Sequence, residues 1–235
     1  MLCISIVYTI NLYKKTKIAR LETCPHGIDI QTKPHPASAK KNIVLIGDSR
    51  IQDWGKPDLG KNIEVINFGT GGATSRETLC QIDATILNLT PEWYIVQVGI
   101  NDIVAASMMK KEERTKIQDQ ILENIKRIIT KLASTGSNIL ILTIVPPISP
   151  DTLRSFVWGD GIEEETARTS KRLLNELPDK VQIYDMKAIF FDFDKNEWKE
   201  DLSSNALHWN DNAYKLLTVE ITKIVAEHDH QTPVN

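Results

Sequence analysis

The 235-residue sequence lacks the features by which many nucleotide-binding and polyanion-binding proteins are recognised. Basic residues are not in excess: 28 Lys and Arg stand against 31 Asp and Glu, and the net charge is -3. We therefore expect no nucleic-acid partner, because recognition of a phosphate backbone usually needs a basic surface. The sequence has neither a Walker-type loop nor a G-x-G-x-x-G run, so it predicts no binding loop for nucleotide phosphates.

Cysteine is also scarce. Cys3, Cys24 and Cys80 are an odd number at scattered positions, and no C-x-x-C or H-E-x-x-H pattern occurs. This usage predicts neither a zinc site, nor a redox pair, nor a disulfide framework, and it does not fix the compartment. We expect no metal and no cofactor.

No apolar run reaches the ~20 residues that a membrane-spanning helix needs. Residues 1–18 come nearest, but they also lack the basic start and the cleavage site of a signal peptide. Two interpretations stay open, the stub of a membrane anchor and a short packing helix. Residues 19–41 are polar, contain three prolines and are predicted to be a linker.

The compartment also stays open at this level. Membrane association through residues 1–18, or an extracytoplasmic location, is favoured over a cytoplasmic one. Against this, the lysines that follow the apolar run would favour a cytoplasmic domain by the positive-inside rule.

From residue 42 to 228 the sequence predicts one α/β domain, followed by a tail at 229–235. Short β-branched runs alternate with segments whose apolar residues recur every three or four positions. The predicted strands are Asn42–Gly47, Ile63–Asn67, Trp93–Val98, Asn138–Ile144 and Gln182–Tyr184. The predicted helices are Arg76–Leu89, Glu112–Ala133, Ile162–Leu177 and Asn212–Glu227. Such alternation predicts a central parallel five-stranded sheet with helices on both faces.

Residues that could take part in nucleophilic catalysis follow the predicted strands. They lie at the carboxyl ends of the strands, where active groups gather in such sheets. Ser49 follows the first strand, a glycine-rich stretch with Gly72 follows the second, and Asn101 follows the third. His208 lies just before the last helix. A hydroxyl nucleophile needs a base and preorganised donors for an oxyanion. Ser49 and His208 are candidates for the first two roles. The N–H groups of Ser49 and Gly72, with the Asn101 amide, are candidates for the third.

Each of these residues also has a structural interpretation. Ser49 could be an ordinary turn residue, His208 a packing residue at a helix start, and Asn101 a helix cap. We interpret Asp48 as a buried acid that accepts hydrogen bonds within the loop. Arg50 could contact an anionic group or pair with a surface acid.

Taken together, four blocks of the sequence resemble those of the SGNH (GDSL-type) hydrolases. The blocks are Gly47-Asp48-Ser49, Asn67 to Ser75, Gly99-x-Asn101-Asp102, and the run from Asn205 through His208 to Asp211. The resemblance implies a three-layer α/β/α, flavodoxin-like fold. It also implies a serine esterase with Ser49 as nucleophile, His208 as base, and an oxyanion hole made by Ser49, Gly72 and Asn101. A small-molecule ester would be the substrate, and no cofactor would be needed.

The sequence departs from the family at Asn205, where the family usually has an aspartate that supports the histidine. The equivalent change costs ~10⁴ in kcat in serine proteases, largely through the wrong histidine tautomer. Three interpretations of this departure stay open. The site could work as a Ser–His dyad oriented by Asn205, another acid such as Asp201 could replace the aspartate, or the site could be weak or inactive.

We expect hydrolysis of an acetyl or short-acyl ester, on a carbohydrate or a lipid, through an acyl-enzyme. The alternative is a catalytically weak or inactive SGNH-like binding domain. A further rival is a plain flavodoxin-like binding module in which the four blocks are coincidental.

Overall fold

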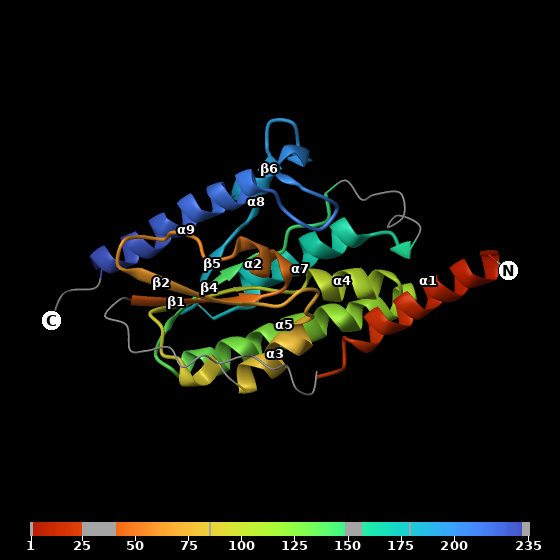
Figure 1. The fold of residues 1–235 in the computed structure, drawn as a ribbon, viewed down its shortest axis with the longest axis horizontal. Coiled ribbons are helices and arrows are strands. Elements are labelled where there is room, and N and C mark those ends of the chain that lie inside the picture. The colour runs from red at the N-terminus through yellow and green to blue at the C-terminus, as the bar shows by residue number, and fades with distance from the viewer. Residues whose placement is uncertain (1, 25–40, 85, 149–156, 179, 232–235) are drawn as a thin grey trace.

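The computed structural model describes residues 2–24, 41–84, 86–148, 157–178 and 180–231 (Figure 1). Most of the segment predicted as a linker, residues 25–40, lies outside the described residues.

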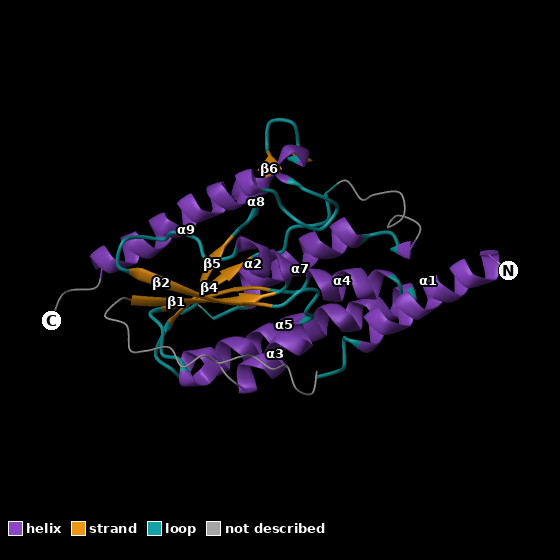
Figure 2. Cartoon of the chain, in the orientation of Figure 1, coloured by secondary structure: helices purple, strands orange, loops and turns teal. Residues whose placement is uncertain are grey.

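A five-stranded parallel sheet forms the centre of the molecule, as the sequence predicts (Figure 2). Its order is β2-β1-β3-β4-β5. The strands are β1 (Lys41–Gly47), β2 (Ile63–Gly69), β3 (Trp93–Gln97), β4 (Asn138–Leu142) and β5 (Gln182–Tyr184). Gly47 at the end of β1 lies opposite Gly69 on one side and Gln97 on the other. The chain segments that leave β1, β2 and β3 therefore start side by side.

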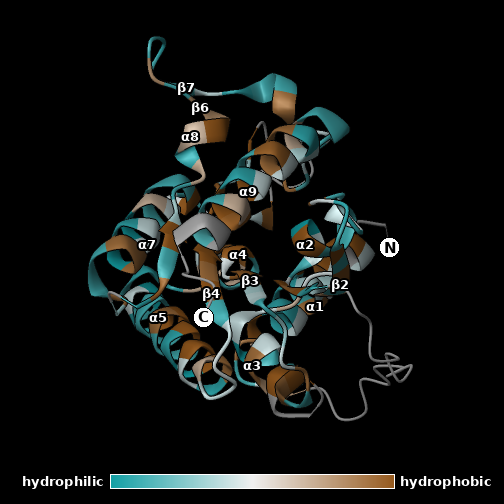
Figure 3. Ribbon diagram, turned by 90° about the vertical axis from the view of Figure 1, so that its left-hand side faces the viewer, coloured by the Kyte–Doolittle hydropathy of each residue, from teal (hydrophilic) through white to brown (hydrophobic). Residues whose placement is uncertain are grey.

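Helices cover both faces of the sheet and complete a three-layer α/β/α arrangement (Figures 2 and 3). One face is covered by α2 (Ser49–Trp54), α8 (Lys187–Phe190) and α9 (Asp211–Gln231). The other is covered by α3 (Ser75–Ala84), α4 (Ile100–Ser107), α5 (Lys111–Ala133) and α7 (Ile162–Glu176). Figure 3 shows apolar and polar stretches on the same helices, as expected for helices that cover a sheet.

Two hydrophobic cores lie against the two faces of the sheet. Along β1, Val44 and Ile46 enter one core, whereas Ile43 and Leu45 enter the other. Successive strand residues point to opposite faces, so a strand that is buried on both sides must be apolar throughout. This is why β1 reads as a continuous apolar run and not as an alternating pattern.

The N-terminal segment forms helix α1 (Leu2–Ala19), whose start projects away from the sheet in Figure 1. Among the described residues, no helix combines the length and apolarity that crossing a bilayer requires. Beyond its last turn, Leu21 is buried and Cys24 forms a disulfide with Cys80 of α3. The expectation that the cysteines form no disulfide framework is therefore wrong for this pair. Membrane association of residues 1–18 stays a prediction.

The predicted elements differ from the observed ones mainly at their ends. The helix predicted at Arg76–Leu89 is two elements, α3 and the 3-10 helix η1 (Ile86–Asn88). The last helix continues to Gln231, three residues into the predicted tail. Six short elements are absent from the predicted helices and strands: α2, α4, α8, β6 (Phe191–Asp192), β7 (Glu197–Trp198) and the 3-10 helix η2 (Glu200–Leu202). They are too short to show a periodicity.

Candidate active site

Ser49 lies at the turn between β1 and α2, where the backbone changes direction abruptly. Asp48 is the N-cap of α2, and its carboxylate accepts a hydrogen bond from the backbone N–H of Arg50 at 2.9 Å. Asp48 is fully buried, whereas Ser49 is partly exposed. The turn therefore holds the serine hydroxyl at the carboxyl end of the sheet, within reach of solvent.

The structure brings His208 to Ser49 across 159 residues of sequence. Nε2 of His208 lies 3.0 Å from Oγ of Ser49, which is hydrogen-bonding distance. On the other side of the ring, Nδ1 lies 3.0 Å from Oδ1 of Asn205. The three side chains thus form a continuous chain, Asn205–His208–Ser49, with the geometry of a nucleophile, its base and an orienting group.

Two further contacts fix which atom of Asn205 faces the imidazole. The backbone N–H groups of Leu207 and His208 donate to Oδ1 of Asn205 at 3.1 and 3.3 Å. A backbone N–H can only donate, so the amide atom that it contacts must be the oxygen. Nδ1 of His208 must then carry a hydrogen to bond the same oxygen. In the neutral ring, Nε2 is left with its lone pair toward Ser49.

Asp201, the replacement acid considered from the sequence, lies elsewhere. It belongs to η2 and is exposed, and its backbone carbonyl accepts a hydrogen bond from the Asn210 side chain at 2.7 Å. The position beside Nδ1 of His208 is held by Asn205. The structure therefore favours the dyad reading, and the role of Asp201 stays a prediction for kinetics.

The loop that follows β2 carries Gly72. Gly69, at the end of β2, packs so closely on α2 that a side chain there would collide with the backbone of Gln52. Gly72 has φ of +69°, in the left-handed region that favours glycine. Gly69 thus holds the beginning of this loop against α2, and Gly72 turns the chain three residues further on.

Asn101, in the first turn of α4, is buried and donates one amide hydrogen to the carbonyl oxygen of Ala73 at 3.1 Å. This bond connects the third block of the sequence to the second. In the predicted oxyanion hole, the donor from Asn101 would be its second amide hydrogen. The roles of Ser49, Gly72 and Asn101 as oxyanion donors stay predictions.

A buried polar network lies next to residues 70–74, the loop between β2 and α3 that carries Gly72 and is called the oxyanion loop below after its predicted role. Asp102 accepts hydrogen bonds from the backbone N–H and the hydroxyl of Ser75, at 2.8 and 2.7 Å. Asn124 of α5 donates to the same hydroxyl at 2.9 Å. Burial raises the pKa of Asp102 to about 7, although the bonds from Ser75 work in the opposite direction. The network connects the first turns of α3 and α4 to α5, and it was not recognised in the sequence.

Arg50 is buried and does not pair with a surface acid, so that alternative from the sequence is wrong. Its guanidinium donates to the carbonyl oxygens of Leu207, Val145 and Pro146 at 2.8, 2.6 and 3.4 Å. The group also lies 5.0 Å from the ring centre of Trp209. Arg50 thus connects the nucleophile's helix to the loop that carries His208.

The charges beside the nucleophile are unusual. Burial raises the pKa of Asp48 to about 6, and the nearby Arg50 guanidinium partly offsets this shift. Burial lowers the pKa of Arg50 to about 10, and Asp48 partly offsets that shift. Arg50 is therefore charged at neutral pH. The interpretation of Asp48 as a buried acid bonded within the loop is confirmed.

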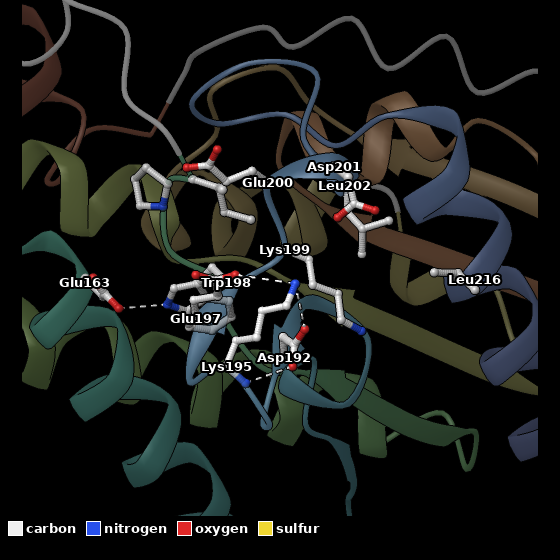
Figure 4. A pocket seen from close by; sticks show the side chains of 12 residues that line it. Glu163, Asp192, Lys195, Glu197, Trp198, Lys199, Glu200, Asp201, Leu202 and Leu216 are labelled. Atoms are coloured by element: carbon white, nitrogen blue, oxygen red, sulfur yellow. Dashed lines mark hydrogen bonds and ion pairs between the residues drawn. The ribbon is translucent and has the colours of Figure 1, made fainter.

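A cavity of about 1000 Å³ lies beside the β6–β7 hairpin and contains Asp201 but neither Ser49 nor His208 (Figure 4). Several of its charged residues contact one another or other residues of its lining. Glu163 accepts from Nε1 of Trp198 at 2.8 Å, and Lys195 lies 3.6 Å from Asp192. Hydrogen-bond geometry, and not cavity size, therefore locates the candidate active site. Within the described residues, no group of three or more His, Cys, Asp or Glu side chains could hold a metal ion.

Comparison with known proteins agrees with this geometry. The model of the GDSL-like Lipase/Acylhydrolase family matches residues 45–216, which is more than half of the chain. The matched range includes Ser49, Gly72, Asn101 and His208. No curated protein matches the sequence.

Solved structures with the same fold include three bacterial proteins. A GDSL-like lipase from Bacteroides thetaiotaomicron has a TM-score of 0.60 at 16% identity, over 80% of this chain and 89% of that one. The lipase/acylhydrolase from Enterococcus faecalis gives 0.59 at 20% identity, over 80% and 96%. A catalytic mutant of an acetylxylan esterase from Geobacillus stearothermophilus gives 0.57 at 17% identity, over 79% and 94%. At these identities the likeness shows a shared fold.

Proposed function

Since the chain belongs to the GDSL-like lipase/acylhydrolase family and is a hydrolase acting on ester bonds, we propose that it cleaves a short-acyl carboxylic ester through an acyl-enzyme on Ser49. The observation that carries the proposal is the 3.0 Å contact between Oγ of Ser49 and Nε2 of His208. The acetylxylan esterase of the same fold makes an acetylated carbohydrate a reasonable first substrate to test.

In the first half of the reaction, Nε2 of His208 takes the proton of Ser49 while Oγ attacks the acyl carbon. Negative charge develops on the former carbonyl oxygen. In the proposed mechanism, the N–H groups of Ser49 and Gly72 and the amide of Asn101 donate hydrogen bonds to it. His208 then gives its proton to the leaving alcohol. In the second half, His208 removes a proton from water, which attacks the acyl-enzyme and releases the acid and free Ser49.

Asn205 supports one part of this cycle better than the other. The Asn205 oxygen holds His208 in the tautomer in which Nε2 can accept a proton. In serine proteases, the Asp-to-Asn change at this position gives the wrong tautomer, and this is the main cause of the lost activity. It brings no negative charge to stabilise the imidazolium that forms afterwards. We therefore propose an active enzyme that is slower than one with an aspartate at position 205.

A fluorophosphonate probe tests the nucleophile directly, together with turnover of p-nitrophenyl acetate. We expect labelling and turnover in the wild type and neither in Ser49→Ala. Ser134→Ala is a matched control, because Ser134 is an exposed serine at the end of α5 whose hydroxyl donates to the backbone carbonyl of Lys131. Absence of both labelling and turnover in the folded wild-type protein would contradict the proposal.

That negative result would favour the second candidate, a weak or inactive binding domain. The missing charge at Asn205 is the observation behind it. The two candidates differ in a measurable way, because a binding domain would retain an acetylated sugar without hydrolysing it. Calorimetry with acetylated xylo-oligosaccharides, followed by analysis of the released acetate, distinguishes them.

A further inference from the structure

The chain beyond α1 is fastened beside the oxyanion loop by several independent contacts. Nε and Nη2 of Arg20 bind the two carboxylate oxygens of Glu77 at 2.7 and 2.8 Å. The hydroxyl of Thr74 donates to the backbone carbonyl of Arg20 at 3.0 Å. The Cys24–Cys80 disulfide holds the segment a few residues further on. The end of α1 is thus a fixed part of the wall around Gly72.

Glu77 is itself held firmly. Its carboxylate accepts from the backbone N–H of Thr74 at 2.9 Å, and the Thr74 hydroxyl accepts from the backbone N–H of Glu77 at 3.2 Å. This reciprocal pair is a capping box at the start of α3. Since Glu77 is buried and cannot turn away, the two-bonded Arg20 guanidinium has a fixed orientation.

The remaining guanidinium nitrogen faces the oxyanion loop. A Cβ added to Gly72 would lie 3.0 Å from Nη1 of Arg20 and 3.8 Å from Nζ of Lys17. Lys17 of α1 and Arg20, which directly follows α1, therefore adjoin the residue whose N–H is proposed to bind the oxyanion. By contrast, Arg50, the basic residue next to Ser49 in sequence, is buried and donates to backbone carbonyls.

From this juxtaposition we infer that the enzyme selects esters that carry a carboxylate close to the scissile bond, with Arg20 Nη1 and Lys17 as the groups that recognise it. The inference rests on the proposed function. Among the described residues, Nη1 of Arg20 has no hydrogen-bond acceptor. A fixed guanidinium of this kind suits a carboxylate, because it can donate to the carboxylate without first losing conformational freedom. Attraction between such charges near a protein surface is large enough to change specificity severalfold.

The experiment compares matched neutral and anionic esters. One pair places the charge on the acyl side, mono-p-nitrophenyl succinate against p-nitrophenyl butyrate. The other places it on the alcohol side, 4-acetoxybenzoate against its methyl ester. The measured quantity is the ratio of kcat/KM for the anionic ester to kcat/KM for its neutral partner, at low and high salt. We expect a ratio above one for at least one pair in the wild type, falling as salt screens the charges.

Lys17→Gln leaves the Arg20–Glu77 pair intact and should lower the ratio ~3–10-fold while kcat/KM for the neutral ester stays the same. Arg20→Gln should lower it further, and Arg20→Lys, which keeps the charge, should restore part of the loss. Lys15→Gln is the control, because Lys15 is exposed on the same helix.

The possible failures are distinct. If no neutral ester is hydrolysed, the proposed function fails. If neutral esters are hydrolysed but the ratio is the same in Lys17→Gln, Arg20→Gln and the wild type, the substrate inference is overturned. An equal loss of kcat for neutral and anionic esters would also overturn it, since the cations would then act on the oxyanion itself.

Discussion

The side-chain oxygen of Asn205 lies 3.0 Å from Nδ1 of His208, on the opposite side of the ring from the nucleophile. The same oxygen accepts hydrogen bonds from two backbone N–H groups. The Asn205 amide therefore cannot rotate to present its NH₂ group to the ring without breaking both bonds. A neutral amide thereby imposes the tautomer that a carboxylate would impose.

We expect Asn205→Asp to raise kcat for p-nitrophenyl acetate by ~10–100-fold, less than the ~10⁴ seen where the tautomer is wrong. The gain would come from charge alone, because the tautomer is already correct. Asn205→Leu should lower kcat ~100-fold, since the ring would lose its orienting bond. Asp201→Ala should leave kcat unchanged. A large loss in Asp201→Ala would instead identify Asp201 as the acid of the site.

Arg50 is predicted to position His208 without touching the substrate. Arg50→Leu would leave three backbone carbonyl oxygens without their donor and should destabilise the protein by ~3 kcal/mol or more. It should also lower kcat ~10–100-fold through displacement of the His208 loop, with a small change in KM. Kinetics and urea unfolding measure the two effects.

A control is needed because any destabilised variant loses some activity. Ile128→Ala in α5 removes a fully buried side chain that is not part of the site and should destabilise by a comparable amount. Equal losses of kcat in Arg50→Leu and Ile128→Ala, measured well below their melting temperatures, would show that Arg50 acts only through stability.

Stability should depend on the ionisation of Asp102. Burial raises the pKa of Asp102 from its ordinary 3.8 to about 7, so the folded state binds more protons than the unfolded state between these two pH values. The contribution of Asp102 is therefore fully present below about pH 4 and is lost as the pH rises through 7. Asp102→Asn does not titrate. Its stability relative to the wild type should rise by up to ~4 kcal/mol between pH 4 and pH 8.

Chemical unfolding of both proteins at several pH values measures this difference. Asp192→Asn is a matched control, because hydrogen bonds from the backbone lower the pKa of Asp192 below its ordinary 3.8. The contribution of Asp192 is therefore lost only as the pH falls below about 4, and the difference between Asp192→Asn and the wild type should stay nearly constant from pH 4 to pH 8. A constant difference between Asp102→Asn and the wild type over this pH range would show that Asp102 is ionised throughout.

The sheet and its main helices could be predicted because their signals are local. β1 is a continuous apolar run, and α5 repeats Ile121, Ile125 and Ile128 along one face. The short elements η2, β6 and β7 could not be predicted, since two or three residues carry no period. The continuation of α9 to Gln231 was missed because the sequence after Glu227 is polar and gives no apolar signal.

The members of the candidate site could be predicted, but their supporting contacts could not. Ser49, Gly72, Asn101 and His208 stand in recognisable blocks. The role of Arg50 in connecting α2 to the His208 loop could not be predicted. Its guanidinium donates to backbone carbonyls, which every residue has, so no partner side chain marks the contact in the sequence. The approach of Lys17 and Arg20 to Gly72 is equally invisible, since it depends on how the end of α1 packs.

The sequence hypothesis of membrane association leads to a prediction for α1. Ile6, Val7, Tyr8 and Leu12 are each more than half exposed, and Lys14 and Lys15 follow them. Exposed apolar side chains beside basic ones suit an anionic lipid surface, where each lysine contributes ~1 kcal/mol. We expect the protein to sediment with vesicles that contain phosphatidylglycerol.

Ile6→Glu combined with Leu12→Glu should abolish that binding. Leu216→Glu is the control, because Leu216 is an exposed apolar residue on α9. If the wild-type protein does not bind vesicles but forms dimers that the α1 substitutions dissociate, the helix covers a second copy and the prediction is wrong.

The Cys24–Cys80 disulfide is expected to stabilise the protein and to hold the specificity of the site. It closes a loop with a sequence separation of 56, for which chain entropy predicts ~4 kcal/mol of stabilisation. Replacing both cysteines by serine should lower the free energy of unfolding by roughly that amount. Because the bond holds the segment that follows Arg20, the same variant should lose part of its preference for anionic over neutral esters while its turnover of neutral esters persists. Cys3→Ser, which leaves the disulfide intact, should change neither quantity.

Thiol titration of the unfolded, unreduced protein should find one free cysteine, and three free cysteines in protein kept under oxidising conditions would contradict the bond itself.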